Sequence, residues 1–213
     1  MLNIGVIGCG AIGRDHIRRL TDIVPGCQVV ACADYFEEAA IKVAAQYEGM
    51  KAYKTGEELI AAPEVQAVVI TSSDPSHAGY VLEALKAGKY VFCEKPLSLS
   101  AEQSRELADL AKEKGVVNYC GFSNIMNPAN QYVAELVKSG KLGKIMRVHA
   151  TYDQDMLLDP SIPIAWRHIN KLAGSGALGD LCSHLLSVSQ MIMGDMSEVL
   201  GVQSIVIPER PVK

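Results

Sequence analysis

Short apolar runs alternate with amphipathic or alanine-rich stretches through the first part of the chain. The expected strands are Leu2–Ile7, Gln28–Ala33, Lys51–Tyr53, Ala67–Thr71, Tyr90–Cys93 and Val116–Gly121. The expected helices are Ala11–Ile23, Phe36–Tyr47, Gly56–Ala61, Ser76–Ala87 and Ala101–Lys114. These strands look apolar on both faces, as in a parallel sheet that is covered by helices. The alternation predicts a doubly wound α/β domain over residues 1–122.

The pattern changes after Phe122. A helix is expected over Asn130–Ser139 and another over Ala177–Met193, whereas Lys144–Asp153 and Val199–Ile207 read as strands. This order predicts a second, smaller α+β unit over residues 123–213. Two strands make a meagre sheet for a domain that must bury its own core.

Composition and charge exclude several classes of function. The chain has 213 residues, 49% of them hydrophobic and 21% charged, and a net charge of −4, which is typical of a soluble globular protein. It has no basic patch, so we expect no nucleic-acid partner. No apolar run is long enough to span a bilayer, and the N-terminus lacks a basic signal region, so we expect no membrane and a cytoplasmic location. Six scattered cysteines without a CxxC pair favour reduced thiols over a metal site.

The strongest local signal is a glycine-rich loop between the first strand and the first helix. The loop reads Gly8, Cys9, Gly10, Ala11, Ile12 and Gly13. Asp34 follows about 20 residues later, at the end of the next strand, which is the context of a dinucleotide fingerprint. The helix N-terminus supplies N–H groups for a phosphate. Asp34 can bind a ribose diol and repels a 2′-phosphate, so the loop predicts NAD rather than NADP.

Two further motifs follow strands of the same predicted sheet, where ligands bind in such folds. The first reads Thr71, Ser72, Ser73, Asp74, Pro75, Ser76 and His77, and it could either contact the cofactor or simply cap a helix. The second is Glu94-Lys95-Pro96. A lysine here could hydrogen-bond a substrate hydroxyl or lower its pKa, although a surface Glu–Lys pair is the alternative.

A fourth motif lies in the second unit. Asp180 and His184 are four residues apart, so they share one face of a helix, behind a glycine-rich stretch that begins at Gly174. An imidazole beside a carboxylate can act as a general base near neutral pH. A solvated polar pair is the alternative interpretation of this spacing.

Together these motifs resemble the Gfo/Idh/MocA family. "GVIGCGAIGRDH", "FCEKPLS" and "GSGALGDLCSH" look like its cofactor loop, its EKP motif and its GGxxxDxxxH helix, in the same order. "PIAWRHINKLAGSGALGD" looks most like members that act on cyclic sugars or polyols, such as levoglucosan or inositol. The resemblance implies a Rossmann domain followed by part of a domain with a mostly antiparallel sheet. In relatives that sheet carries the oligomer contact, and their chains continue well beyond residue 213.

The resemblance also implies roles for individual residues. Lys95 would touch the reacting hydroxyl and the nicotinamide ribose, His184 would be the acid/base, and Asp180 would orient the substrate. Trp166 and Arg167 would border the nicotinamide and the sugar. Because relatives often hold the proline after this lysine in cis, we expect a cis bond there, which is otherwise uncommon.

Three functions are compatible with these observations. The first is an NAD-dependent oxidoreductase of cyclic polyols or sugars, acting as a homo-oligomer. The second is a non-catalytic NAD-binding module, because a shortened second domain need not close a substrate site. The third is a sugar-responsive regulatory protein that keeps the fold without turnover.

Overall fold

The computed structural model describes residues 1–165, 168–169 and 176–212. Trp166 and Arg167, which were predicted to border the cofactor, lie outside the described residues. The chain forms two compact units, Met1–Gly121 and Phe122–Lys213, and each is described by itself below.

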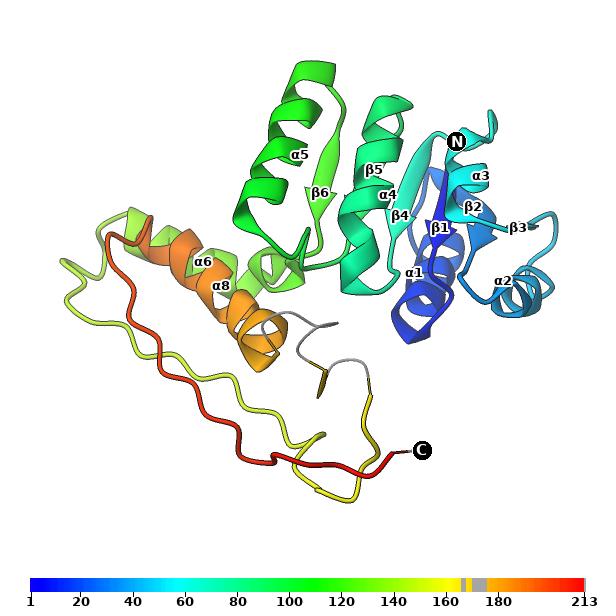
Figure 1. The fold of residues 1–213 in the computed structure, drawn as a ribbon. Coiled ribbons are helices and arrows are strands. Elements are labelled where there is room, and N and C mark those ends of the chain that lie inside the picture. Colours follow the sequence, from blue (N-terminus) through cyan, green and yellow to red (C-terminus); the bar gives the residue numbers. More distant parts are fainter. Residues whose placement is uncertain (166–167, 170–175, 213) are drawn as a thin grey trace. The chain divides into compact units, whose positions relative to one another are not determined.

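The first unit is built on one parallel six-stranded sheet in the order β3-β2-β1-β4-β5-β6 (Figure 1). The strands are β1 Leu2–Ile7, β2 Cys27–Ala33, β3 Lys51–Tyr53, β4 Ala67–Ile70, β5 Tyr90–Cys93 and β6 Asn118–Cys120. The order reverses on either side of β1, which gives the topological switch point of a doubly wound fold between β1 and β4. The predicted parallel sheet with helices is confirmed.

Helices cover both faces of this sheet. They are α1 Ala11–Asp22, α2 Glu37–Ala44, α3 Gly56–Ala61, α4 Asp74–Lys86 and α5 Ala101–Lys114. Helices α3, α4 and α5 contribute Leu59, Val81 and Leu107 to a core on one face, whereas α1 and α2 contribute Ile17 and Val43 to a core on the other. The central strands are therefore buried on both sides, which explains their continuous apolar runs.

The helix ends follow from local side-chain chemistry. Thr55 caps α3 by accepting a hydrogen bond from the Glu58 N–H, and Ser100 caps α5 through the Gln103 N–H. Gly115 ends α5 in a left-handed conformation with φ 63°, which a glycine adopts without steric cost. These signals explain why both helices lie within the predicted ranges.

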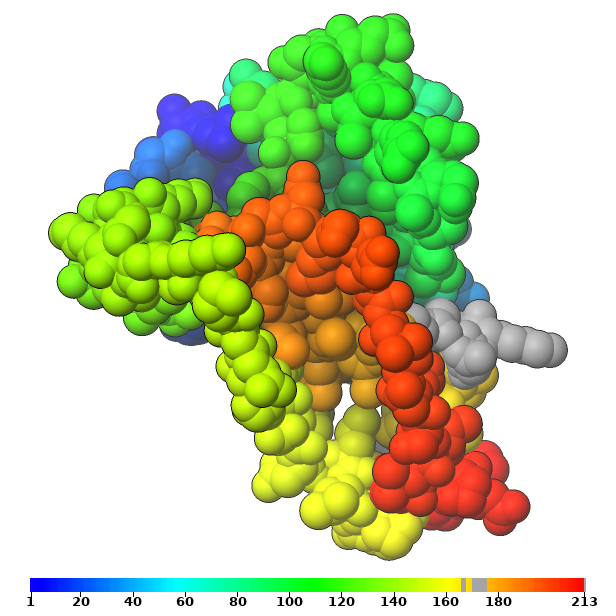
Figure 2. Space-filling view, turned by 90° about the vertical axis from the view of Figure 1, so that its left-hand side faces the viewer, coloured from blue at the N-terminus to red at the C-terminus, as the bar shows by residue number. Residues whose placement is uncertain are grey.

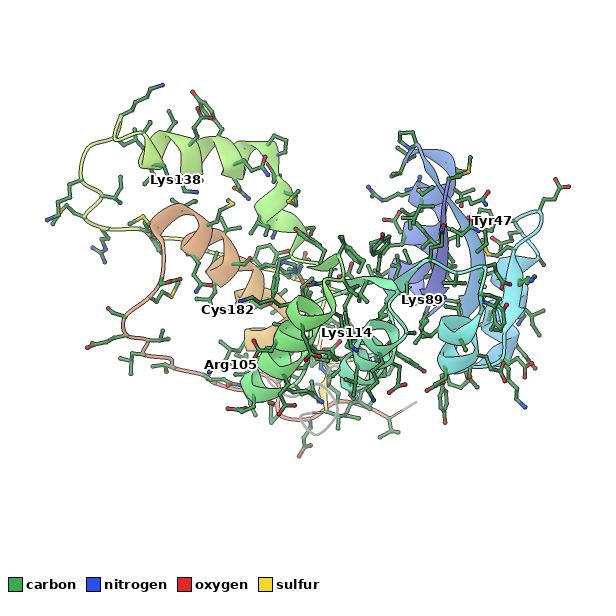
Figure 3. All side chains as sticks on the ribbon, turned by 90° about the horizontal axis from the view of Figure 1, so that it is seen from above. Tyr47, Lys89, Arg105, Lys114, Lys138 and Cys182 are labelled. Atoms are coloured by element: carbon green, nitrogen blue, oxygen red, sulfur yellow. The ribbon has the colours of Figure 1, made fainter. Side chains whose placement is uncertain are left out.

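The second unit contains the short 3₁₀ helix η1 (Ser123–Met126), α6 (Pro128–Lys138), the π-helical turn η3 (Leu178–Cys182) and α8 (Ser183–Met193). Helices α6 and α8 pack against each other, and Lys138 and Cys182 mark the end of α6 and the entry to α8 in Figure 3. Asn127 caps α6 by accepting a hydrogen bond from the Ala129 N–H, and Pro128 opens the helix.

The two segments of the second unit that were expected to be strands do not form strands. Residues 144–153 and 199–207 run as extended arms, with atoms of α8 visible between them in Figure 2. Their sequences alternate as strands do, but a ladder also needs a neighbouring strand, and a two-stranded sheet is marginal in water. The expected second-domain sheet is therefore not formed among the described residues.

None of the described helices is both long and apolar enough to cross a lipid bilayer.

Candidate functional site

The carboxyl ends of four strands of the first unit stand level with one another. Ile7 of β1 is aligned with Ala33 of β2 and Ile70 of β4, and Ile70 is aligned with Cys93 of β5. The residues that follow these strands are neighbours along one edge of the sheet, in the order Asp34, Gly8, Thr71 and Glu94. The sheet register thus brings three of the predicted motifs together at the switch point, where ligands bind in folds of this type.

The geometry of the glycine loop assigns a different task to each glycine. Gly8 has φ 100°, which favours glycine, and it makes the turn out of β1. A Cβ on Gly13 would lie 1.8 Å from the carbonyl oxygen of Gly8, so α1 can pack this closely only with glycine there. A Cβ on Gly10 would meet no atom within 4 Å. Ala11 and Ile12 lie exposed in the first turn of α1, where backbone N–H groups lack partners within the helix.

The carboxylate of Asp34 is held in place by two backbone N–H groups. The Cys9 N–H donates to Oδ2 at 2.6 Å, and the Phe36 N–H donates to Oδ1 at 2.9 Å. The first bond joins Asp34 directly to the glycine loop. A carboxylate oxygen accepts more than one hydrogen bond, so the two oxygens can still accept hydrogen bonds from the hydroxyls of a ribose diol.

The loop after β4 is organised by its own hydrogen bonds. The Thr71 hydroxyl donates to the Gly8 carbonyl oxygen at 2.8 Å, so this side chain holds the glycine loop in place. The hydroxyls of Ser72 and Ser76 lie 2.6 Å apart. Ser73 occupies the N-cap position of α4 without a capping hydrogen bond from its side chain, and an exposed Pro75 follows in the first turn of α4. The capping alternative for Ser73 therefore fails.

His77 was predicted to contact the cofactor, and its position differs from that expectation. The side chain is 1% exposed, and both ring nitrogens face backbone carbonyl oxygens. Nothing in the sequence distinguishes such a histidine from one that points into the crevice.

Glu94 is paired with a residue that the sequence analysis missed. The His16 Nε2 lies 2.8 Å from Glu94 Oε1, and the imidazole packs on the Phe92 ring with centroids 5.1 Å apart. Gly121 lies against the same carboxylate, because a Cβ there would stand 3.0 Å from Glu94 Oε2. His16 follows Gly13 by three residues, so it shares the face of α1 that packs on the sheet, and this spacing is the signal that could have revealed it.

Lys95 follows Glu94 and is half-buried. The peptide bond between Lys95 and Pro96 is cis, which confirms the expectation.

Asp180 and His184 belong to the second unit. Asp180 lies in the π-helical turn η3, and His184 is the second residue of α8, so they are not related by a regular α-helical turn as expected. The cause is local: Gly179 weakens the helix, and the Ser183 hydroxyl donates to the Gly179 carbonyl oxygen at 2.6 Å. The His184 ring contacts the rings of Phe122 and Tyr152, with centroids 6.1 and 6.2 Å apart.

Three of the five cysteines of the first unit, Cys9, Cys93 and Cys120, are unsuited to nucleophilic chemistry. Burial raises the pKa of the Cys93 thiol well above its usual range and that of Cys120 to about 11. A hydrogen bond with Cys32 also raises the pKa of Cys9. These three thiols are protonated at neutral pH, and a protonated thiol is a poor nucleophile. No cluster of three or more His, Cys, Asp or Glu side chains that could hold a metal ion occurs in the part of the chain that the structure describes.

Comparison with protein families gives two matches. Residues 2–122 match the family described as "Oxidoreductase family, NAD-binding Rossmann fold" (Gfo/Idh/MocA), and residues 130–213 match the "GFO/IDH/MocA C-terminal domain". The chain is 32% identical to the levoglucosan dehydrogenase of Pseudarthrobacter phenanthrenivorans, over 100% of this chain and 56% of that protein. It is 36% identical to the inositol 2-dehydrogenase of Pseudomonas syringae, over 100% of this chain and 60% of that protein.

Solved structures show the same relationship. A levoglucosan dehydrogenase in complex with NADH and levoglucosan has a TM-score of 0.90 at 32% identity, over 99% of this chain and 59% of that one. An NAD-binding oxidoreductase from Klebsiella pneumoniae has a TM-score of 0.82 at 38% identity, over 91% of this chain and 53% of that one. The chain therefore spans between half and two thirds of the length of these relatives.

Proposed function

Because the chain belongs to the Gfo/Idh/MocA oxidoreductase family, we propose that it binds NAD and serves hydride transfer from a CH–OH group of a cyclic polyol or sugar. The observation that carries this proposal is the edge of the first unit's sheet. There the glycine loop, Asp34 and Lys95 follow strands that end at the same level. Relatives named for levoglucosan and inositol support the class of substrate.

The first unit fits a dinucleotide. Open space at Gly10, beside the N-terminus of α1, leaves room for a pyrophosphate to approach the backbone. The Asp34 carboxylate, already aligned by the Cys9 N–H, suits the diol of a ribose. The other residues of the loop would bind the cofactor through their backbone groups; they are Gly8, Ala11, Ile12 and Gly13.

The remaining contacts in the first unit are proposed from their positions. Thr71, Ser72, Ser73 and Pro75 would line the cofactor beside β4, and Glu94 and Lys95 would do so beside β5. Thr71 and Glu94 would act chiefly by holding the glycine loop and the EKP segment. Outside the described residues, Trp166 and Arg167 remain proposed neighbours of the nicotinamide and the sugar.

Bound NAD would supply a hydride acceptor for the alcohol carbon. The Lys95 ammonium would donate a hydrogen bond to the reacting hydroxyl and lower its pKa, since a nearby positive charge favours the alkoxide. His184 would take the hydroxyl proton, and Asp180 would orient the substrate. We propose this division of labour between a cofactor domain, 1–122, and a substrate domain, 123–213.

A second candidate is a non-catalytic NAD-binding module. It is favoured by one observation: residues 144–153 and 199–207 form no strands. NAD titration followed by a polyol panel separates the two candidates. Binding with NADH formation supports the oxidoreductase, and binding without NADH formation in a protein of the relatives' full length supports the module. A sugar-responsive protein without NAD affinity would bind the polyol alone.

We also propose that the two extended arms are strands of a mostly antiparallel sheet when partner strands are present, and that such a sheet joins copies into a homo-oligomer. The exposure of large apolar side chains on the arms supports this proposal. Met146 is 79% exposed and Val202 is 96% exposed. Exposed apolar strand edges recruit other chains. Light scattering across protein concentration tests the proposal, and a strictly monomeric protein contradicts it.

A further inference from the structure

His77 is one of two buried polar residues among those that the structure describes. It lies in the first turn of α4, and its ring is enclosed in the first unit. Its Nδ1 lies 2.6 Å from the Pro96 carbonyl oxygen, and its Nε2 lies 3.0 Å from the Ser72 carbonyl oxygen. Both distances are within hydrogen-bonding range. One side chain therefore connects two backbone groups that are far apart in the sequence.

Both partners can only accept a hydrogen bond, so both bonds form together only when the ring carries a proton on each nitrogen, as the imidazolium does, whereas a neutral ring donates to one of the two carbonyls. A buried carbonyl that lacks a donor costs free energy. The arrangement therefore makes the ring a donor to the two segments and takes its nitrogens away from any bound molecule. For this reason the ring nitrogens of His77 do not make the expected contact with the cofactor.

The two carbonyls belong to the two segments that frame the proposed nicotinamide end of the site. Ser72 lies in the loop after β4, and Pro96 follows Lys95 directly after β5. The two strands are hydrogen-bonded neighbours that end level with each other, at Ile70 and Cys93. Helix α4 packs on this sheet through Leu85 and other buried residues, so it is a fixed base for the ring.

We infer that His77 is a positioning residue that clamps the Lys95–Pro96 segment to the loop at Ser72. The Pro96 bond fixes the backbone from which Lys95 extends, and the Ser72 bond fixes the loop that would line the cofactor. The clamp rests on the proposed function for its effect on catalysis, whereas its mechanical effect on the two segments does not depend on any activity.

Two substitutions separate the two bonds. His77→Asn places an amide near the position of Nδ1 and keeps the donor to Pro96, whereas His77→Gln places it near Nε2 and keeps the donor to Ser72. Amide hydrogen exchange is measured on peptides that cover residues 71–76 and 94–100. We expect His77→Gln to speed exchange about 10-fold in 94–100 only, and His77→Asn to do so in 71–76 only, as expected for the loss of one hydrogen bond.

Kinetics in the NAD-dependent assay supply the second readout. His77→Gln should lower kcat about 10-fold with little change in the KM for NAD, because Lys95 loses its anchor. His77→Asn should raise the KM for NAD several-fold and keep kcat. Val81→Ala is the matched control: it lies further along α4 and is 3% exposed, so it weakens packing without touching either carbonyl. It should leave both kinetic constants unchanged.

The clamp is contradicted if the Asn and Gln variants change the same peptide, or if both behave like Val81→Ala. If neither variant folds, the unmodified protein decides: a solvent-protected Nδ1–H resonance of His77 supports the Pro96 bond, and a freely exchanging one overturns it. Failure of the proposed function can be told apart from failure of the clamp. In that case the unmodified protein would form no NADH, but the Asn and Gln variants would still show the expected changes in amide exchange.

Discussion

Asp34 illustrates how one side chain can set cofactor preference. Its carboxylate is fixed between the N–H groups of Cys9 and Phe36, so it has little freedom to turn away from a ligand. A ribose diol gains hydrogen bonds from this carboxylate, whereas a 2′-phosphate meets a negative charge at close range.

We therefore expect NAD to bind at least about tenfold more tightly than NADP, which corresponds to ~1.4 kcal/mol. Asp34→Ala should reduce this difference between the affinities for NAD and NADP. Asp15→Ala is the control for net charge, because Asp15 lies on α1 with its side chain 44% exposed and pairs with Arg18 and Arg19. Calorimetric titration with both cofactors measures the difference, and equal affinities in the unmodified protein contradict the assignment.

Gly10 and Gly13 allow binding and folding to be tested separately. Gly10→Ala adds a methyl group into open space, so the protein should fold normally but bind NAD at least about tenfold more weakly, since the pyrophosphate must approach there. Gly13→Ala drives a methyl group against the Gly8 carbonyl oxygen, so it should unfold at lower temperature even without cofactor. Thermal melts with and without NAD measure both effects. Normal NAD affinity in Gly10→Ala would show that the phosphate lies elsewhere.

At the scale of elements, Glu64 ties the edge strand β3 to the connection between α3 and β4. The Lys51 ammonium and the Tyr53 hydroxyl each donate to Glu64 Oε1 at 2.7 Å. These two hydrogen bonds, led by that from Lys51, lower the pKa of Glu64 from 4.5 to about 2. A carboxyl group with a lowered pKa in the folded state stabilises the fold above its unfolded pKa and loses that effect as pH falls.

The contribution of Glu64 should accordingly be complete above about pH 5 and disappear as pH falls toward about 2. Glu64→Gln should be less stable than the unmodified protein at neutral pH, by a small amount because the pair is solvated, and the difference should shrink on acidification. Lys51→Met should reduce the effect of Glu64→Gln. Urea unfolding across this pH range measures the difference in free energy of unfolding between the unmodified protein and Glu64→Gln. A difference that does not change with pH contradicts the role of the pair.

The elements of the first unit could be predicted from the sequence because local signals and packing agree there. The positions of β1, β2, β4 and β5 follow from apolar runs, and the glycine loop and Asp34 follow from their spacing. The contact of His16 with Glu94 and the burial of His77 could not be predicted, because they depend on how helices lie against the sheet. In the second unit, alternation predicted strands, but a strand also requires a partner, which the pattern does not supply. The π-helical turn at Asp180 arises from Gly179 and Ser183, whose effect on a helix is not visible as periodicity.

At the scale of the whole molecule, the two units differ in how much of the backbone is held by regular structure. The first has a covered six-stranded sheet, whereas the described part of the second has α6, α8, the short turns η1 and η3, and long extended arms with exposed apolar side chains such as Val206, 81% exposed. Segments with few buried contacts open most readily.

Limited proteolysis should therefore cut within residues 123–213 before it cuts within 1–121. With trypsin, Lys144 and Arg147 in the first arm should be cleaved well before Arg105 and Lys112 in α5. Mass spectrometry of the early fragments identifies the sites. Equal resistance of both units in a protein that stays monomeric would contradict this account of the second unit.

The central claim, that this chain serves NAD-dependent oxidation of a polyol or sugar, is tested most directly by NADH formation in a panel of cyclic polyols and sugars. The measurement compares the unmodified protein with Lys95→Ala and His184→Ala, each first checked for NAD binding. We expect NADH formation by the unmodified protein, NAD affinity within a few-fold in both variants, and turnover lower by about 10²–10⁴-fold, the usual contribution of acid/base groups. A variant that binds NAD and keeps a near-normal rate, or an unmodified protein of the relatives' full length that oxidises no member of the panel, would contradict the claim.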